Sequence, residues 1–252
     1  MRFIGLCAVL ALCAVSAAQA AEIRIITPGV ISNSGLDDVA AAFEKQTGVK
    51  VTIQVDGMGA IMDDIAGKPA DVVMLPMDLM GTAALCGTAT TFTPLGRVEI
   101  GLFKKPDAPR PDISTVAKLV TAMKTASAVF YTDPASGSMQ AAMSGRMLAR
   151  TDFAGIRSQP IKGDAEPALK RGDGDGAAMG LGLIHGPHDP ENSPTDNPYL
   201  IGMLPAGLNM HMDMATGVSA RASDKIHAAA FIAFAISPAM RAVWKFKGVN
   251  RY

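Results

Sequence analysis

The chain has few cysteines and few aromatic side chains, and it carries no excess of charge of either sign. Of its 252 residues three are cysteine and 5% are aromatic, while 23 basic residues balance 23 acidic ones. A neutral chain lacks the basic excess that phosphate contacts need, which argues against nucleic acid as a partner. The 49% of hydrophobic residues can still bury a full core, which excludes an intrinsically disordered protein.

Long apolar runs are also scarce, and the only extended one lies near the start of the sequence. A positive charge at Arg2 precedes an apolar run over residues 3–15, and Ala18 and Ala20 match the small residues of a cleavage site. This layout is typical of a secretory signal peptide, so we predict that residues 1–20 form a cleavable export signal and that the mature protein is periplasmic. The run is shorter than the roughly 20 apolar residues that a membrane-spanning helix needs.

Signatures of catalysis are missing from the rest of the chain. Cys86, the only cysteine after residue 20, cannot form an internal disulfide and has no histidine signature nearby, so we expect a buried, inert thiol. No G-x-S-x-G elbow, H-E-x-x-H pair or Walker loop occurs. The neighbouring acids at 37–38 and 63–64 cannot face each other on a helix, which argues against an acid-base pair. We therefore predict a protein that is not an enzyme and has no cofactor.

Strand-like and helix-like patterns alternate through the first part of the mature chain. They predict strands over 23–27, 49–55, 71–75 and 97–103, and helices over 35–46 and 60–66. Ser34 is expected to cap the first of these helices and Gly48 to end it. Strands that alternate with helices through short connections are typical of a parallel, doubly wound sheet.

A second alternating region begins after the polar, proline-rich residues 104–111. It predicts helices over 114–125, 137–150 and 166–171, strands over 128–131, 176–184 and 199–204, and a surface loop over 185–198. A strand over 212–220 and helices over 224–236 and 238–246 complete the chain. We predict an α/β protein with two lobes, the first formed by 21–103 and 212–252 and the second by 104–211.

Several segments resemble the type II periplasmic solute-binding proteins of the molybdate-binding kind. They are AAAFEKQTGVKV at 40–51, KPADVV at 68–73, YTDPASG at 131–137, FIAF at 231–234, SP at 237–238 and VWKFKG at 243–248. The segments occur in the order expected for that family and span nearly the whole mature chain. The resemblance implies a two-lobed type II clamshell, in which each lobe is a mostly parallel sheet flanked by helices.

The same resemblance implies a function. Such a protein is an exported receptor that captures a small solute in the cleft between its lobes and delivers it to an ABC import permease. It performs no chemistry on the solute, and its lobes close on the ligand through a hinge motion. We expect a monomer whose partners are a small anionic solute and the permease.

Three loops that follow predicted strands carry the candidate ligand contacts. The resemblance implies that hydroxyl groups and backbone N–H groups of these loops hold the anion. The candidates are Thr27 in the first loop, Gly57 and Met58 in the second, and Thr132, Ser136 and Ser138 in the third. The third loop leads into a helix, whose free N–H groups and positive dipole end favour an anion, although a serine there is also an ordinary N-cap.

The identity of the anion stays open at this point. Molybdate binders tend to place serine in both of the first two loops, whereas this chain has Met58 in the second loop and the acidic Asp56 beside it. The departure from the family pattern weakens the expectation of molybdate. We therefore predict an anion that is either an oxyanion or a small carboxylate.

Two alternatives share the predicted fold. The methionines Met210, Met212 and Met214, together with His185, His188 and His211, combine thioether and imidazole groups, which suit copper. The first alternative is therefore a periplasmic copper-binding protein. The main prediction, an anion receptor, assigns no residue to metal binding. The second is a receptor that passes its signal to a sensor instead of a permease.

Overall fold

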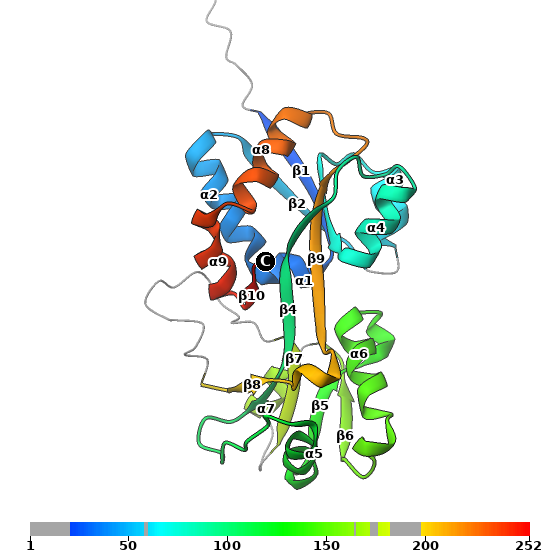
Figure 1. The fold of residues 1–252 in the computed structure, drawn as a ribbon, viewed down its shortest axis with the longest axis vertical. Coiled ribbons are helices and arrows are strands. Elements are labelled where there is room, and N and C mark those ends of the chain that lie inside the picture. Colours follow the sequence, from blue (N-terminus) through cyan, green and yellow to red (C-terminus); the bar gives the residue numbers. More distant parts are fainter. Residues whose placement is uncertain (1–20, 58–59, 164, 172–175, 182–197) are drawn as a thin grey trace, which may run out of the picture.

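The computed structural model describes residues 21–57, 60–163, 165–171, 176–181 and 198–252 (Figure 1). The predicted signal peptide therefore lies outside the described residues, as do Met58, His185 and His188. Among the described residues, no single helix is long and apolar enough to cross a membrane. One bent pair, Lys225–Ala235 with Pro238–Phe246, passes that test together, and it contributes Phe231 and Trp244 to the core.

The described strands form one ten-stranded sheet with the order β2-β1-β3-β9-β4-β7-β5-β6, in which β8 and β10 also pair with β4. The strands are β1 (Glu22–Thr27), β2 (Lys50–Val55), β3 (Val72–Pro76), β4 (Thr93–Lys104), β5 (Val129–Thr132), β6 (Ser158–Ile161), β7 (Ala177–Leu181), β8 (Leu200–Met203), β9 (His211–Val218) and β10 (Val249–Asn250). Strand β1 is parallel to β2 and β3, and β5 is parallel to β6 and β7. Strands β4 and β9 are antiparallel to their neighbours. The predicted α/β class is confirmed, and parallel strands occupy both ends of the sheet.

The helices cover this sheet in two groups (Figure 1). The helices are α1 (Gly29–Ile31), α2 (Asp37–Thr47), α3 (Ile61–Gly67), α4 (Met77–Leu85), α5 (Val116–Thr125), α6 (Met139–Leu148), α7 (Glu166–Arg171), α8 (Lys225–Ala235) and α9 (Arg241–Phe246). Helices α2, α3, α4, α8 and α9 gather with β1 and β2, whereas α5, α6 and α7 gather with β5 to β8. The long strands β4 and β9 run from one group to the other.

The hydrophobic core follows the same grouping. In one pair of clusters, the buried members come from residues 23–98 and 212–249, and Phe43 packs edge-on against Phe231 at 5.2 Å between ring centroids. In the other pair, they come from residues 100–210. The two cores separate within β4 and at the start of β9. We therefore keep as a proposal the division into two lobes, one formed by 21–103 and 212–252 and the other by 104–211.

Several details differ from the sequence expectations. The helix predicted to begin at residue 35 begins at Asp37 as α2, because a kink at Gly35, with a φ of 104°, separates it from the helical turns that start at Gly29. Ser34 does not cap it: the Ser34 hydroxyl donates to the carbonyl of Val30. The expectation of a buried thiol was also wrong, because Cys86 is exposed at the end of α4. Gly48 does end α2, with a φ of 74° that favours glycine.

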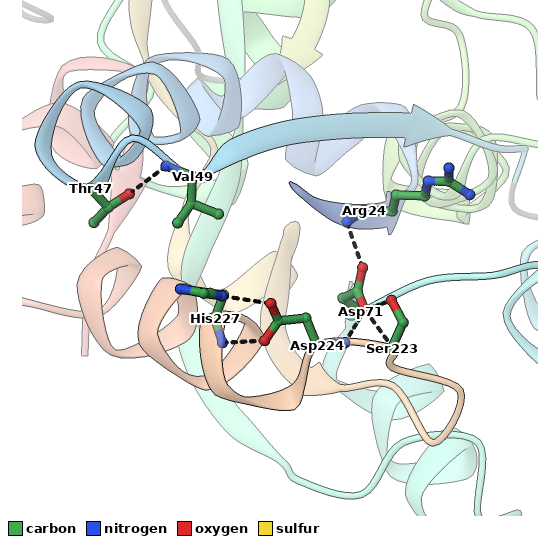
Figure 2. Close-up of polar contacts among 7 residues, drawn as sticks. All are labelled: Arg24, Thr47, Val49, Asp71, Ser223, Asp224 and His227. Atoms are coloured by element: carbon green, nitrogen blue, oxygen red, sulfur yellow. Dashed lines mark hydrogen bonds and ion pairs between the residues drawn. The ribbon is translucent and has the colours of Figure 1, made fainter. Parts of the chain in front are cut away.

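A buried carboxylate ties the beginning of β3 to β1 and to the segment before α8 (Figure 2). Asp71 is 3% exposed and accepts hydrogen bonds from the backbone N–H of Arg24 at 2.9 Å, of Ser223 at 2.8 Å and of Asp224 at 3.0 Å. The Ser223 hydroxyl donates a fourth bond at 2.9 Å. Asp224 in turn caps α8 by accepting from the N–H of His227 at 3.0 Å.

Gly217 provides a test of the central packing between β9 and the segment before β4. A Cβ atom at this position would lie 2.2 Å from the backbone carbonyl oxygen of Thr91. Because neither backbone can yield cheaply, Gly217→Ala should lower the free energy of unfolding by about 1–3 kcal/mol, measured by urea denaturation. Gly81→Ala in α4 is the control: it meets nothing within 4 Å and should be neutral or stabilising by up to about 1 kcal/mol. Equal loss in both variants would contradict the assigned packing.

Candidate functional site

A cavity of about 270 Å³ lies where the carboxyl ends of β1, β2 and β5 meet the starts of α1 and α6. The described residues that line it are Pro28, Gly29, Val30, Asn33, Asp56, Gly57, Thr132, Ser136, Gly137, Ser138, Met139, Gln140, Gly163 and Met212. The edge where strands end and helices begin is the usual place for a ligand in an α/β sheet. The cavity therefore occupies the region in which the sequence analysis placed its candidate contacts.

The structure brings most of the predicted contact residues together. Gly57, Thr132, Ser136 and Ser138 all line this cavity, although Gly57 is separated from the other three by more than 70 positions in the sequence. Thr27 is not among the lining residues: it is fully buried at the end of β1, and its hydroxyl lies 3.4 Å from the carbonyl oxygen of Pro28.

The start of α6 is built by a series of local hydrogen bonds. Asp133 accepts from the N–H of Ala135 at 2.9 Å, and Ser136 Oγ accepts from the N–H of Ser138 at 3.3 Å. Ser138 is the N-cap of α6 and accepts from the N–H of Ala141 at 3.2 Å. Ser138 therefore has the ordinary role of an N-cap. Helix α6 begins at Met139, two residues after the predicted start at 137.

This cap leaves two donors at the cavity. Met139 and Gln140 are the first two residues of α6, so their N–H groups have no carbonyl partner within the helix. Both residues line the cavity. Because the positive end of the helix dipole lies at the same point, this wall attracts negative charge.

The hydroxyl group of Thr132 adds a further donor. Thr132 is the last residue of β5, only 6% exposed, and it lines the cavity. Its Oγ1 is buried and has no hydrogen-bond partner among the described residues. A buried hydroxyl without a partner is unfavourable, and native structures rarely retain one without a reason. A ligand with an acceptor atom in the cavity would supply the missing partner.

Sequence reasoning missed several residues of this wall. Val30 and Asn33 line the cavity because the helical segment begins at Gly29, directly after β1. The Pro-Gly pair at 28–29 resembles a turn, so that early start was hidden, although proline before the first helical turn was an available signal. Met212 reaches the cavity from β9, more than 60 residues away from α6 along the chain, and no local pattern indicates that contact.

The only charged residue among the described lining residues is acidic. Asp56 accepts from Gln54 Nε2 at 2.7 Å and pairs with Lys68, whose Nζ lies 3.3 Å from Oδ1. Lys68 also pairs with Asp64 at 3.0 Å, and these hydrogen bonds, that of Asp64 foremost, raise the pKa of Lys68. One cation thus faces two carboxylates, and this part of the wall carries a net negative charge.

The methionine and histidine residues of the copper alternative do not form a common site among the described residues. Met212 and Met214 pack in one hydrophobic cluster, while Met210 packs in another. His211 faces Asp213, with 3.8 Å between Nε2 and Oδ2. Within the described ranges, no three side chains of histidine, cysteine, aspartate or glutamate are placed to hold a metal ion. These thioethers fill the core, as the alternation of buried residues along β9 requires.

Comparison with known proteins decides the family. Residues 30–250 match the bacterial extracellular solute-binding proteins. The chain belongs to this family. The match covers nearly all of the described residues and most of those that line the cavity. The resemblance of the sequence segments to periplasmic solute-binding proteins is thus confirmed.

Solved structures show that the fold is shared as well. The solute-binding protein resembles the substrate-binding domain of a putative molybdenum ABC transporter from Clostridium difficile, with a TM-score of 0.71 at 13% identity over 92% of this chain and 100% of the other. It also resembles the periplasmic molybdate-binding protein of Azotobacter vinelandii, with a TM-score of 0.65 at 16% identity over 91% of this chain and 99% of the other. At these identities the likeness establishes the fold.

One curated relative has a different description. The solute-binding protein is 32% identical over 125 residues to an aconitate isomerase from a Pseudomonas species, across 45% of this chain and 48% of the relative. The matched part thus spans about half the length of that relative.

Proposed function

We propose that this protein is a periplasmic receptor that captures a small anion, an oxyanion or a small carboxylate, and delivers it to an ABC import permease. The observation that carries the proposal is the unpartnered, buried hydroxyl of Thr132 beside the start of α6 in one cavity. Both groups are donors, so both would be satisfied by an acceptor atom. Two structural neighbours support an anion as the solute: one is described as the substrate-binding domain of a putative molybdenum ABC transporter and the other as a molybdate-binding protein.

The proposed contacts follow from that geometry. Thr132, Ser136 and Ser138 would donate hydroxyl hydrogen bonds, and Gly57 would contribute its backbone from the loop after β2, next to Met58 in the sequence. Thr27 would act through the position of Pro28, since it does not line the cavity. A few hydroxyl and N–H donors can hold one small anion without a basic side chain.

The apolar start of the sequence supports a cleavable export signal over residues 1–20 and a periplasmic location. We propose a monomer that closes on its ligand by movement about β4 and β9, the strands that join the two groups of elements. A permease is the proposed recipient; a sensor is the alternative recipient with the same cavity.

The proposal includes no chemical change in the solute, and the similarity to an aconitate isomerase makes that point testable. Incubation of the purified protein with cis- or trans-aconitate should give no interconversion, followed by the ultraviolet absorbance of the double bond. Steady interconversion that is lost in a Thr132→Val variant would overturn a pure receptor and favour an enzyme in the same cavity.

Binding itself is tested by thermal unfolding with a panel of anions. A ligand at a hundred times its dissociation constant should stabilise the protein by about 2.7 kcal/mol, which corresponds to a rise in Tm of about 5–10 °C for a chain of this size. Oxyanions, small carboxylates and cupric or cuprous ions form the panel. No shift with any anion, together with a shift with copper, would replace the anion receptor by the copper-binding alternative.

A further inference from the structure

The cavity has an apolar section that an inorganic oxyanion would not use. Val30, Met139 and Met212 line it and pack on the same hydrophobic cluster, with Met212 only 3% exposed. Methyl and thioether groups donate no hydrogen bonds. An anion whose outer atoms are all oxygens would leave several of them desolvated and unpaired against this section.

The size of the cavity points in the same direction. The cavity of about 270 Å³ is many times the space that a single water molecule needs. A tetrahedral oxyanion would fill a minor part of it. A carbon skeleton with one or more carboxylates would fill more of it.

The end of β2 offers an acceptor to the same cavity. Asp56 lines the cavity, and its partners Gln54 and Lys68 occupy some of the lone pairs of its carboxylate, which can accept further hydrogen bonds. The second carboxylate on Lys68, that of Asp64, leaves this corner negative. This negative corner therefore repels a compact dianion and favours a neutral hydrogen-bond donor, such as a hydroxyl group.

These features together specify the chemistry of the ligand. We infer that the solute is a small hydroxycarboxylate, whose carboxylate lies against Thr132 and the start of α6, whose carbon skeleton packs on Met139 and Met212, and whose hydroxyl donates to Asp56. The inference rests on the proposed function, since it names the solute of the same cavity. It separates the two anion classes that the receptor proposal leaves open.

Matched ligand pairs test the inference by isothermal titration calorimetry on the mature protein. The pairs are lactate with propionate and malate with succinate, alongside molybdate, tungstate and phosphate. A charge-assisted hydrogen bond to Asp56 should make a hydroxy acid bind at least about tenfold more tightly than its deoxy partner, and more tightly than any of the inorganic anions.

Variants of Asp56 assign the preference to its carboxylate. In Asp56→Ala the ratio between hydroxy and deoxy acid should fall to near one, because the acceptor is gone, while the deoxy acid binds as well as before or better. Asp56→Asn, which keeps the shape of the side chain, should give an intermediate ratio. Asp63→Ala is the matched control: it removes the same charge from an exposed position on α3 and should leave both affinities unchanged.

Each remaining outcome has a defined meaning. Equal binding of the hydroxy and deoxy acids, or a ratio unchanged in Asp56→Ala, overturns the hydroxycarboxylate. Tight binding of molybdate or tungstate without binding of carboxylates also overturns it, but leaves the anion receptor standing. Absence of binding by every anion refutes the receptor proposal itself.

Discussion

Replacing Asp71 by alanine is expected to lower the free energy of unfolding by about 3 kcal/mol or more. The Asp71 carboxylate accepts hydrogen bonds from Arg24 and from the adjacent residues Ser223 and Asp224, so it joins three segments that lie far apart in the sequence (Figure 2). Hydrogen bonds to a charged group each contribute about 1.5–3 kcal/mol, and donors left without an acceptor in a buried site add a desolvation cost. For a chain of this size, the loss corresponds to a fall in Tm of about 6–12 °C.

Two companion variants separate the charge from the general effect of truncation. Asp71→Asn keeps the size of the side chain but replaces one acceptor by a donor, which would face N–H groups, so it should also be strongly destabilising. Asp224→Ala removes the cap of α8 and should cost only about 1 kcal/mol. If Asp71→Ala costs no more than Asp224→Ala, the carboxylate does not hold these segments together.

The secondary structure around the cavity could be predicted where the pattern is local. The alternation along β1, the apolar spacing of α2 and the left-handed stop at Gly48 all follow from neighbouring residues. Helix α4 was not predicted, since it begins directly after Pro76 without a capping side chain. Strand β6 was missed because Pro160 interrupts a short polar segment, which an edge strand tolerates.

The candidate site, too, could be predicted only where its residues are neighbours in the sequence. The third loop was recognisable because a strand ending in Thr132 runs through a turn into a helix capped by serine. The pairing of Asp56 with Lys68, and the presence of Met212 and Met139 in one cavity, depend on how distant segments fold against each other. A sequence read alone shows which groups can donate to an anion, but not which apolar and acidic groups surround them.

The unpartnered hydroxyl of Thr132 is unfavourable for stability but useful for the proposed binding of an anion. Thr132, Ser144, Thr216 and Ser237 each have a buried hydroxyl oxygen without a partner among the described residues, but Thr132 is the only one of these four that lines the cavity. An unpaired donor lowers stability when the cavity is empty and raises affinity when an acceptor arrives. Removal of this donor should therefore raise the stability of the empty protein and lower its affinity for the anion.

Thr132→Val is the substitution that tests this opposition. Valine has nearly the same shape and suits a strand, but it cannot donate a hydrogen bond. We expect anion affinity to fall about ten- to a hundredfold, because a hydrogen bond to a charged acceptor contributes about 1.5–3 kcal/mol. The free energy of unfolding without ligand should rise by up to about 1 kcal/mol, because the buried, unpaired hydroxyl is gone. Calorimetric titration and urea denaturation measure the two effects.

Thr216→Val is the matched control for both measurements. Thr216 is fully buried in β9 and its hydroxyl is also unpartnered among the described residues, but it does not line the cavity. The variant should gain stability in the same way and keep the affinity of the unmodified protein. If Thr132→Val binds every anion as tightly as before, the hydroxyl does not contact the solute. If both variants lose affinity alike, the effect arises from packing, and the position of the anion beside α6 would be wrong.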